Sequence, residues 1–202
     1  MNHCEMIWST AGTNRVCGRC LSLKDSVVGH TDEAGVQLPP LHPRANVGGK
    51  SPHLVGAINP KSTAQVKQVL DWFETVAVTA PVENAMIITP AGEIYHCTGD
   101  LNTLDSIVEL GDKLRGATVT HNHPLGSDND YSFSEADRNL FDKFKLACLR
   151  GVDETFTCEM NRNPGFLDNE DEIPEVMKGY AVHRLNIQRA RFFGYGYRRW
   201  MR

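Results

Sequence analysis

The stretch Ala85-Met86-Ile87-Ile88-Thr89-Pro90-Ala91-Gly92-Glu93-Ile94-Tyr95-His96-Cys97 contains two apolar runs separated by a short polar break. Residues 85–89 have the length and composition of a buried strand, and residues 94–97 form a second apolar run. Pro90 and Gly92 favour a turn between them, because Pro presets its own φ and Gly accepts positive φ. The sequence therefore predicts a β-hairpin here.

Helices and further strands are expected on both sides of this hairpin. Before it, Ser62 or Thr63 is a candidate N-cap for a helix that has apolar residues at Val66, Val69, Leu70 and Phe73. After it, the pattern predicts helices over 104–114, 134–149 and 174–193 and strands over 117–120 and 155–160. This order predicts an α/β fold in which a mixed sheet is flanked by helices.

Composition and charge restrict the class of protein. Hydrophobic residues make up 41% and charged residues 23% of the 202 residues, as in ordinary globular domains. The formal charge of −4 does not indicate a protein that binds polyanions over its whole surface. No apolar run approaches the ~20 residues of a membrane span, and the N-terminus has no signal-peptide pattern. With only six cysteines, we expect a reducing, intracellular setting and no membrane partner.

Two histidines follow the strand expected over 117–120, in the segment Thr120-His121-Asn122-His123-Pro124-Leu125-Gly126. Side chains two residues apart on a strand point to the same side, so His121 and His123 can meet at one metal ion. An open catalytic zinc site commonly has a carboxylate as its third protein ligand and keeps a fourth position for water. Asp137, in the first turn of the next expected helix, is the candidate for that ligand.

Such a site also needs a base that takes a proton from the water. Glu83 precedes the apolar run 85–89, and we favour it over Glu93, which lies beside the expected turn. Ser134 is a candidate donor to the oxyanion that forms when water attacks a carbonyl. Other interpretations remain open, because Ser134-x-x-Asp137 is also a helix capping box and Glu83 can simply be a solvated residue.

Taken in order, these elements resemble the motif of the JAMM (JAB/MPN) metalloproteases over roughly residues 80–160. The matching positions are Glu83, His121-x-His123-Pro124-x-Gly126 and Ser134-x-x-Asp137. The His-Asn-His-Pro segment is most similar to the RadC-like and phage-type branches. The ten residues between His123 and Ser134 form a longer loop than the family usually has, and an insertion in a polar loop costs little.

The resemblance implies a cytidine-deaminase-like JAB/MPN fold and a Zn²⁺ ion held by His121, His123 and Asp137. It further implies that Glu83 is the general base and that Ser134 steadies the tetrahedral intermediate. The expected activity is that of a metalloprotease or isopeptidase, the hydrolysis of amide bonds in a peptide or protein substrate.

Residues 1–60 contain many Gly and Pro residues and predict a loop-rich N-terminal module. Within it, Cys17-Gly18-Arg19-Cys20 and His42 suggest a second, structural zinc site, with packed thiols or a redox pair as alternatives. Together with Trp8-Ser9-Thr10-Ala11 and Pro39-Pro40-Leu41-His42-Pro43, this segment resembles the C-terminal end of phage Mu F-like minor head (head morphogenesis) proteins. Arg44, Ala45 and Asn46 stand where that family usually continues with cysteines.

This second resemblance implies a phage or prophage origin, capsid proteins as partners, and a location in the host-cell cytoplasm or in the virion. We therefore divide the chain into the N-terminal module (1–60), a JAMM-like metallohydrolase domain (61–173) and a C-terminal helix with a basic, aromatic tail (174–202). A zinc-dependent hydrolase is the favoured function. The alternatives are a capsid-morphogenesis protein whose JAMM-like domain serves binding or assembly, and a toxin-like or cell-wall-cleaving effector.

The tail from Lys178 to Arg202 contains seven basic and no acidic residues, interleaved with aromatic ones. Basic and aromatic side chains together can bind nucleic acid, so DNA contact is one interpretation. The favoured interpretation is a helix whose cationic end complements its dipole, followed by aromatic side chains anchored on the body of the domain.

Overall fold

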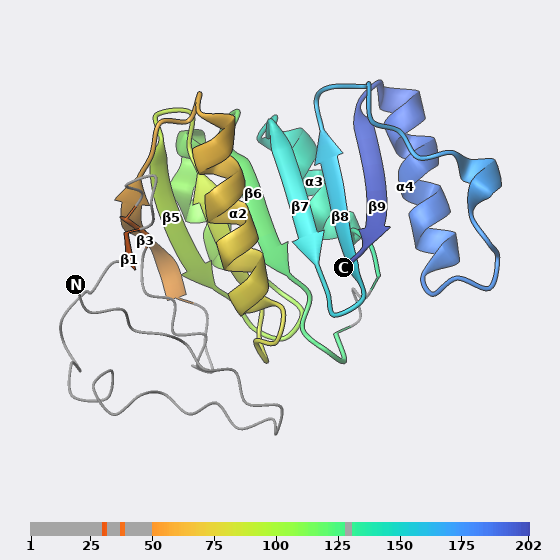
Figure 1. Cartoon of the computed structure of the whole chain (residues 1–202), viewed down its shortest axis with the longest axis horizontal. Coiled ribbons are helices and arrows are strands. Elements are labelled where there is room, and N and C mark those ends of the chain that lie inside the picture. Colours follow the sequence, from red (N-terminus) through yellow and green to blue (C-terminus); the bar gives the residue numbers. More distant parts are fainter. Residues whose placement is uncertain (1–29, 32–36, 39–49, 128–130) are drawn as a thin grey trace.

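The computed structural model describes residues 30–31, 37–38, 50–127 and 131–202. Its central feature is a seven-stranded mixed sheet with the order β3-β5-β4-β6-β7-β8-β9 (Figure 1). The strands are β3 (Lys50–Ala57), β4 (Asn84–Ile88), β5 (Glu93–Thr98), β6 (Thr118–Asn122), β7 (Cys148–Val152), β8 (Phe156–Asn161) and β9 (Gly196–Met201). The helices are α2 (Thr63–Ala77), η1 (Asp105–Leu114), α3 (Glu135–Lys143), η2 (Glu170–Glu172) and α4 (Tyr180–Phe193). Two short strands, β1 (His30–Thr31) and β2 (Gln37–Leu38), pair with each other.

Apolar side chains cover both faces of the sheet. On one face, Met86 and Ile88 of β4 pack with Phe73 of α2, which crosses in front of the sheet in Figure 1. On the other face, Ile87 and Val119 belong to a core that also takes side chains from η1, α3 and α4. Because β4 is covered on both faces, its sequence is a continuous apolar run rather than an alternating one.

The mixed character of the sheet comes from one parallel pair. Strands β6 and β7 are parallel, whereas the other neighbouring strands are antiparallel. A parallel pair requires a crossover connection, and here the connection contains α3. The chain therefore leaves β6 after Asn122 and enters α3 at Glu135.

Several expected elements are confirmed. The hairpin is formed by β4 and β5, and the amide of Gly92 donates to the carbonyl of Thr89 in the turn between them. Helix α2 begins at Thr63, with Ser62 as its N-cap. The mixed α/β sheet flanked by helices is also confirmed.

The helix predicted over 134–149 is too long. It ends at Lys143, and Lys145 takes a left-handed φ of 52° that turns the chain back toward the sheet. Residues Cys148–Val152 then form β7. The apolar pattern did not place the end of the helix, because Cys148 and Leu149 continue the apolar series beyond Lys143.

Two other helices differ from expectation. The segment Asp105–Leu114 is a 3₁₀ helix interrupted at Gly111, where φ is 54° and ψ is −126°. The last helix begins at Tyr180 rather than at Pro174, and left-handed Gly179 precedes it.

The sheet takes both of its edge strands from outside residues 61–173. Strand β3 lies within the segment expected to be loop-rich, and its two register irregularities fall at residues 51–52, which include Pro52, and at Val55. Strand β9 lies within the expected tail and pairs with β8 along its length. Its cations contact groups of the domain: Arg198 pairs with Glu159 at 3.2 Å, and Arg199 Nη1 donates to the carbonyl of Tyr131 at 2.7 Å.

Within the described residues, no helix has both the length and the apolar character needed to cross a bilayer.

Candidate metal centre

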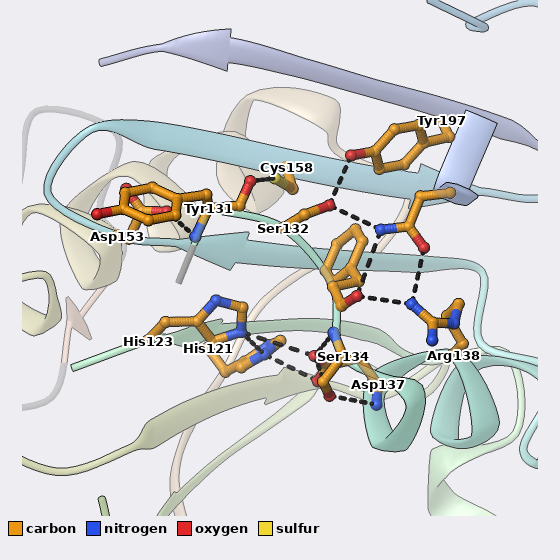
Figure 2. A network of polar contacts seen from close by, with 12 residues as sticks. His121, His123, Tyr131, Ser132, Ser134, Asp137, Arg138, Asp153, Cys158 and Tyr197 are labelled. Carbon is orange, nitrogen blue, oxygen red and sulfur yellow. Dashed lines mark hydrogen bonds and ion pairs between the residues drawn. The ribbon is translucent and has the colours of Figure 1, made fainter. Parts of the chain in front are cut away.

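The end of β6 brings two imidazoles together. Thr118, Val119 and Thr120 favour an extended backbone, and the alternation of side chains places His121 and His123 on the same face. Both histidines are 3% exposed, and their Nε2 atoms lie 2.8 Å apart. Figure 2 shows both rings directed toward Asp137 at the start of α3.

Asp137 is held in the first turn of α3 by a capping box. The Ser134 hydroxyl accepts from the amide of Asp137 at 3.1 Å, and Asp137 Oδ2 accepts from the amide and the hydroxyl of Ser134 at 2.8 and 2.7 Å. Asp137 Oδ1 lies 3.0 Å from His121 Nε2, and Oδ2 lies 3.6 Å from His123 Nε2. The capping and metal-ligand interpretations are therefore compatible, because Asp137 caps the helix and faces the histidines at once.

Glu83 lies directly before β4, on the histidine side of the sheet. Ala85 pairs with His121, and Glu83, two residues before Ala85, presents its side chain to the same face. Glu83 is 5% exposed, and its backbone bonds to Gly99 and Asp100 beyond the end of β5. The carboxylate of Glu83 is close enough to the paired imidazoles for its charge to raise the pKa of His121.

The electrostatics of the site couple these groups. Burial by itself lowers the pKa of His121, but the charge and hydrogen bond of Asp137 and the charge of Glu83 together raise it above its ordinary value. Burial would raise the pKa of Asp137, yet the adjacent His121 and His123 hold it well below its ordinary value. Asp137 is therefore a carboxylate at neutral pH, which is the form that binds a metal.

Glu93, the sequence alternative to Glu83 as the base, lies elsewhere. Glu93 begins β5 at the hairpin end, where it forms an ion pair with Lys113 at 3.0 Å. That end of β4 is about 10 Å from Ala85, since a strand rises ~3.4 Å per residue. Ser132 is 2% exposed, and its hydroxyl contacts Tyr197 Oη at 2.8 Å instead of the carboxylate of Asp137. Ser134 is thus the serine of the Ser-x-x-Asp unit.

Asn122 is a site residue that the sequence pattern did not single out. It lies between the two histidines but points to the opposite face, where it is fully buried. Its Oδ1 accepts from the amide of Asn84 at 2.8 Å, and its Nδ2 donates to the carbonyl of Val82 at 3.1 Å. The side chain of Asn122 therefore links the end of β6 by hydrogen bonds to the backbone on both sides of Glu83.

Gly151 and Phe133 pack against the imidazole rings of the site. Gly151 pairs with His121, and a Cβ there would lie 3.1 Å from Phe133 Cε1, 3.4 Å from His123 Cε1 and 3.5 Å from His121 Cε1. The Phe133 ring is fully buried, with its centroid 6.3 Å from that of His121. A Gly within a strand is a sequence signal of such close approach.

The cysteines among the described residues are not part of this group of ligands. Burial raises the pKa of Cys97, Cys148 and Cys158 to about 12 each, so all three stay protonated. Of the ligands suggested for a second zinc site, Cys17, Cys20 and His42 lie outside the described residues.

Among the described residues, His121, His123 and Asp137 are the group of His, Cys, Asp and Glu side chains that could hold a metal ion, with ligand atoms within 4.8 Å of one another. No protein-family model matches the chain, and comparison with curated proteins and with solved structures finds no match. The inference about this buried group therefore depends on its own chemistry: it could bind a metal ion.

Proposed function

We propose that this chain is a zinc-dependent hydrolase of amide bonds, with a JAMM-like (JAB/MPN) domain of cytidine-deaminase-like fold. The observation that carries the proposal is the convergence of five separate positions on one side of the sheet. These positions are Glu83, His121, His123, Ser134 and Asp137.

The donor atoms fit zinc. Tetrahedral ligands about 2.0–2.1 Å from Zn²⁺ lie about 3.3 Å from one another. The three separations in the site are 2.8 Å between the two histidine Nε2 atoms, and 3.0 and 3.6 Å from these atoms to the carboxylate oxygens of Asp137. Two imidazoles and one carboxylate also form a ligand set of open catalytic zinc sites, which leave one position for water or substrate.

The residues of the chain have distinct parts in the proposed hydrolysis. Zinc, when bound, would act as a Lewis acid toward water and the amide carbonyl. Glu83 takes a proton from the attacking water on its carboxylate and gives it to the leaving amine. The Ser134 hydroxyl, which donates to Asp137 Oδ2 at 2.7 Å, turns its hydrogen toward the oxyanion as negative charge develops there.

The proposed context is a phage or prophage, in the host-cell cytoplasm or in the virion, with a peptide or protein such as a capsid component as substrate. This part of the proposal rests on the sequence of the N-terminal module alone. The second candidate, a binding or assembly domain, keeps the metal ion as a structural element and predicts zinc without hydrolysis.

The test measures zinc and hydrolysis in the full chain. We expect one zinc that is lost in His123→Ala and retained in Glu83→Gln, and any zinc of the N-terminal module to be lost in a Cys17→Ser/Cys20→Ser variant. Amide hydrolysis is followed on a panel of peptides, isopeptide-linked peptides and peptidoglycan stem peptides. Glu83→Gln should abolish it, whereas the matched control Glu93→Gln should not.

Zinc binding without hydrolysis of any member of the panel would favour the assembly function. If Glu83→Gln keeps full activity with zinc bound, Glu83 is not the base.

A further inference from the structure

The segment that precedes α3 has no regular backbone structure, although it carries Ser134 into the site. Ser132 and Phe133 lie in this segment and are 2% and 0% exposed. Their polar groups are removed from water and need partners within the protein. Those partners come from α4 and β9, at the far end of the chain.

Tyr197 and Asn186 hold this segment. Tyr197 Oη lies 2.8 Å from the hydroxyl of Ser132, and Asn186 Nδ2 donates to the same hydroxyl at 2.7 Å. Asn186 Nδ2 also lies 3.3 Å from the carbonyl of Phe133, which it reaches as a donor. Both Tyr197 and Asn186 are 0% exposed. Figure 2 shows the contact of Ser132 and Tyr197 above Ser134, and the two histidines to the left of Ser134.

Arg138 joins the same contacts to the metal-ligand helix. It directly follows Asp137, and its Nη1 donates to the carbonyl of Phe133 at 2.7 Å and to Asn186 Oδ1 at 3.0 Å. The Phe133 ring, in turn, packs beside the imidazole of His121 and lies against Gly151. Contacts to α4 and β9 thus reach both sides of the Ser134–Asp137 unit.

From this geometry we propose that Ser132, Asn186 and Tyr197, the buried clamp, act as positioning residues that hold Asp137 and Ser134 at the metal site. Helix α4 and strand β9 would then complete the site, although they contribute none of its ligands. The inference rests on the proposed metal site for its functional meaning, but the positioning itself can be measured without metal.

The physical reason is the cost of an unmade buried hydrogen bond. The Tyr197 hydroxyl contacts both Ser132 Oγ and His183 Nδ1, each at 2.8 Å. Removal of that hydroxyl takes one hydrogen-bond partner from each of these two buried atoms, so the segment gains by moving toward another arrangement. A fully satisfied buried polar network specifies one geometry, which is what the orientation of Asp137 requires.

The experiment compares Tyr197→Phe and Ser132→Ala with Tyr195→Phe in the full chain. Tyr195 is a matched control, because it is also buried, at 2% exposure, but packs on Phe141 outside the buried clamp. The first readout is hydrogen exchange at the amides of Ser134 and Asp137 in metal-free protein, since both amides donate within the capping box.

We expect exchange at these two amides to become about tenfold faster in both clamp variants, relative to amides of α2, and to be unchanged in Tyr195→Phe. The second readout is the Zn²⁺ dissociation constant, which should rise about tenfold in the clamp variants, as for other partners that orient metal ligands. In the same variants, the visible absorption spectrum of the Co²⁺-loaded chain should differ from that of the wild type. The effects of the double variant should be smaller than the sum of the two single ones, because both single variants remove the contact between Ser132 and Tyr197.

The inference is overturned if both clamp variants exchange at the wild-type rate, or if Tyr195→Phe accelerates the two amides equally. A wild-type chain that binds no zinc would refute the proposed function, while the exchange measurement would still decide whether the buried clamp positions Asp137.

Discussion

Oδ1 of Asp137 lies 3.0 Å from Nε2 of His121, across the space between the first turn of α3 and the end of β6. The other oxygen of the same carboxylate accepts from the amide and hydroxyl of Ser134. One side chain therefore both begins a helix and completes a cluster of metal ligands. The capping box fixes the direction of the carboxylate before a metal arrives, which lowers the cost of ordering the site on binding.

Asp137→Asn separates these two tasks. Asparagine keeps a cap acceptor, so we expect less than about 1 kcal/mol of lost stability. The loss of the charged ligand should weaken zinc binding by more than about a hundredfold, beyond the effect of an outer partner. Glu135→Gln, which removes an exposed charge from the same helical turn, is the control. Chelator competition and thermal unfolding measure both effects, and unchanged zinc affinity in Asp137→Asn would show that Asp137 is only a cap.

Gly151→Ala tests the close packing under the histidines. The added methyl would lie 3.1 Å from the Phe133 ring and 3.4 Å from that of His123, so the rings must move. We expect a loss of about 1–3 kcal/mol in urea unfolding, as for other overpacked cores, together with weaker zinc binding. Gly165→Ala is the comparison, because its nearest neighbour is the flexible amide of Asn163 at 3.2 Å. Equal stabilities of the two variants would contradict the inference that Gly151 is closely packed against Phe133 and His123.

Asn122→Ala tests whether the hydrogen bonds between Asn122 and the backbone around Glu83 are needed to position Glu83. The variant leaves the amide of Asn84 without this acceptor and removes one of the two donors to the carbonyl of Val82, the other being Asn84 Nδ2, so about 1–3 kcal/mol of stability should be lost. Hydrolysis should fall while zinc affinity stays near the wild-type value, because both histidines remain. Thr120→Val removes a buried hydrogen bond to Glu74 from the same strand face, away from Glu83, and is the control. If the two variants hydrolyse substrate equally well, Asn122 has no special part in placing Glu83.

The stability of the domain should depend on pH through His183. Burial and the positive charge of Arg199 lower the pKa of His183 to about 4, and Asp168 Oδ2, at 3.7 Å from its Nε2, is beyond hydrogen-bond distance. The unfolded chain, with a histidine pKa near 6.5, therefore binds a proton more readily than the folded one.

The contribution of His183 to stability is fully present above about pH 6.5 and is lost as the pH falls toward 4. The total loss is about 3 kcal/mol, since one pKa unit corresponds to ~1.4 kcal/mol. Urea unfolding between pH 4 and 7.5 measures the slope, and His183→Gln should remove this part of it. A variant with the wild-type slope would show that other groups cause the pH dependence.

Local features of the site were predictable from the sequence. The hairpin needed only an apolar run, a turn and a second run, and the shared direction of His121 and His123 needed only the period of a strand. The capping box needed only the spacing of Ser134 and Asp137. Glu83 lies at the end of β4 that pairs with His121, whereas Glu93 lies at the other end; the role of Glu83 as base stays a prediction.

The elements that the sequence did not predict correctly are those whose state depends on neighbours. The prediction extended the helix to Leu149, two residues into β7, whereas Cys148–Val152 form a strand because β6 and β8 hydrogen-bond to them on both sides. Strand β9 was predicted to be part of a basic tail. It is an edge strand because its backbone forms hydrogen bonds with β8 and with Asp168.

By itself, the sequence determined the interactions that act over a few residues: the direction of the histidine pair, the turn of the hairpin and the cap of α3. Only the tertiary structure decided which residues distant in the sequence form contacts at the site. Asn122 reaches Asn84 across 38 positions of the chain, and Ser132 reaches Tyr197 across 65. Contacts of that range have no periodic signal, because they arise from strand register and core packing, which depend on the whole chain at once.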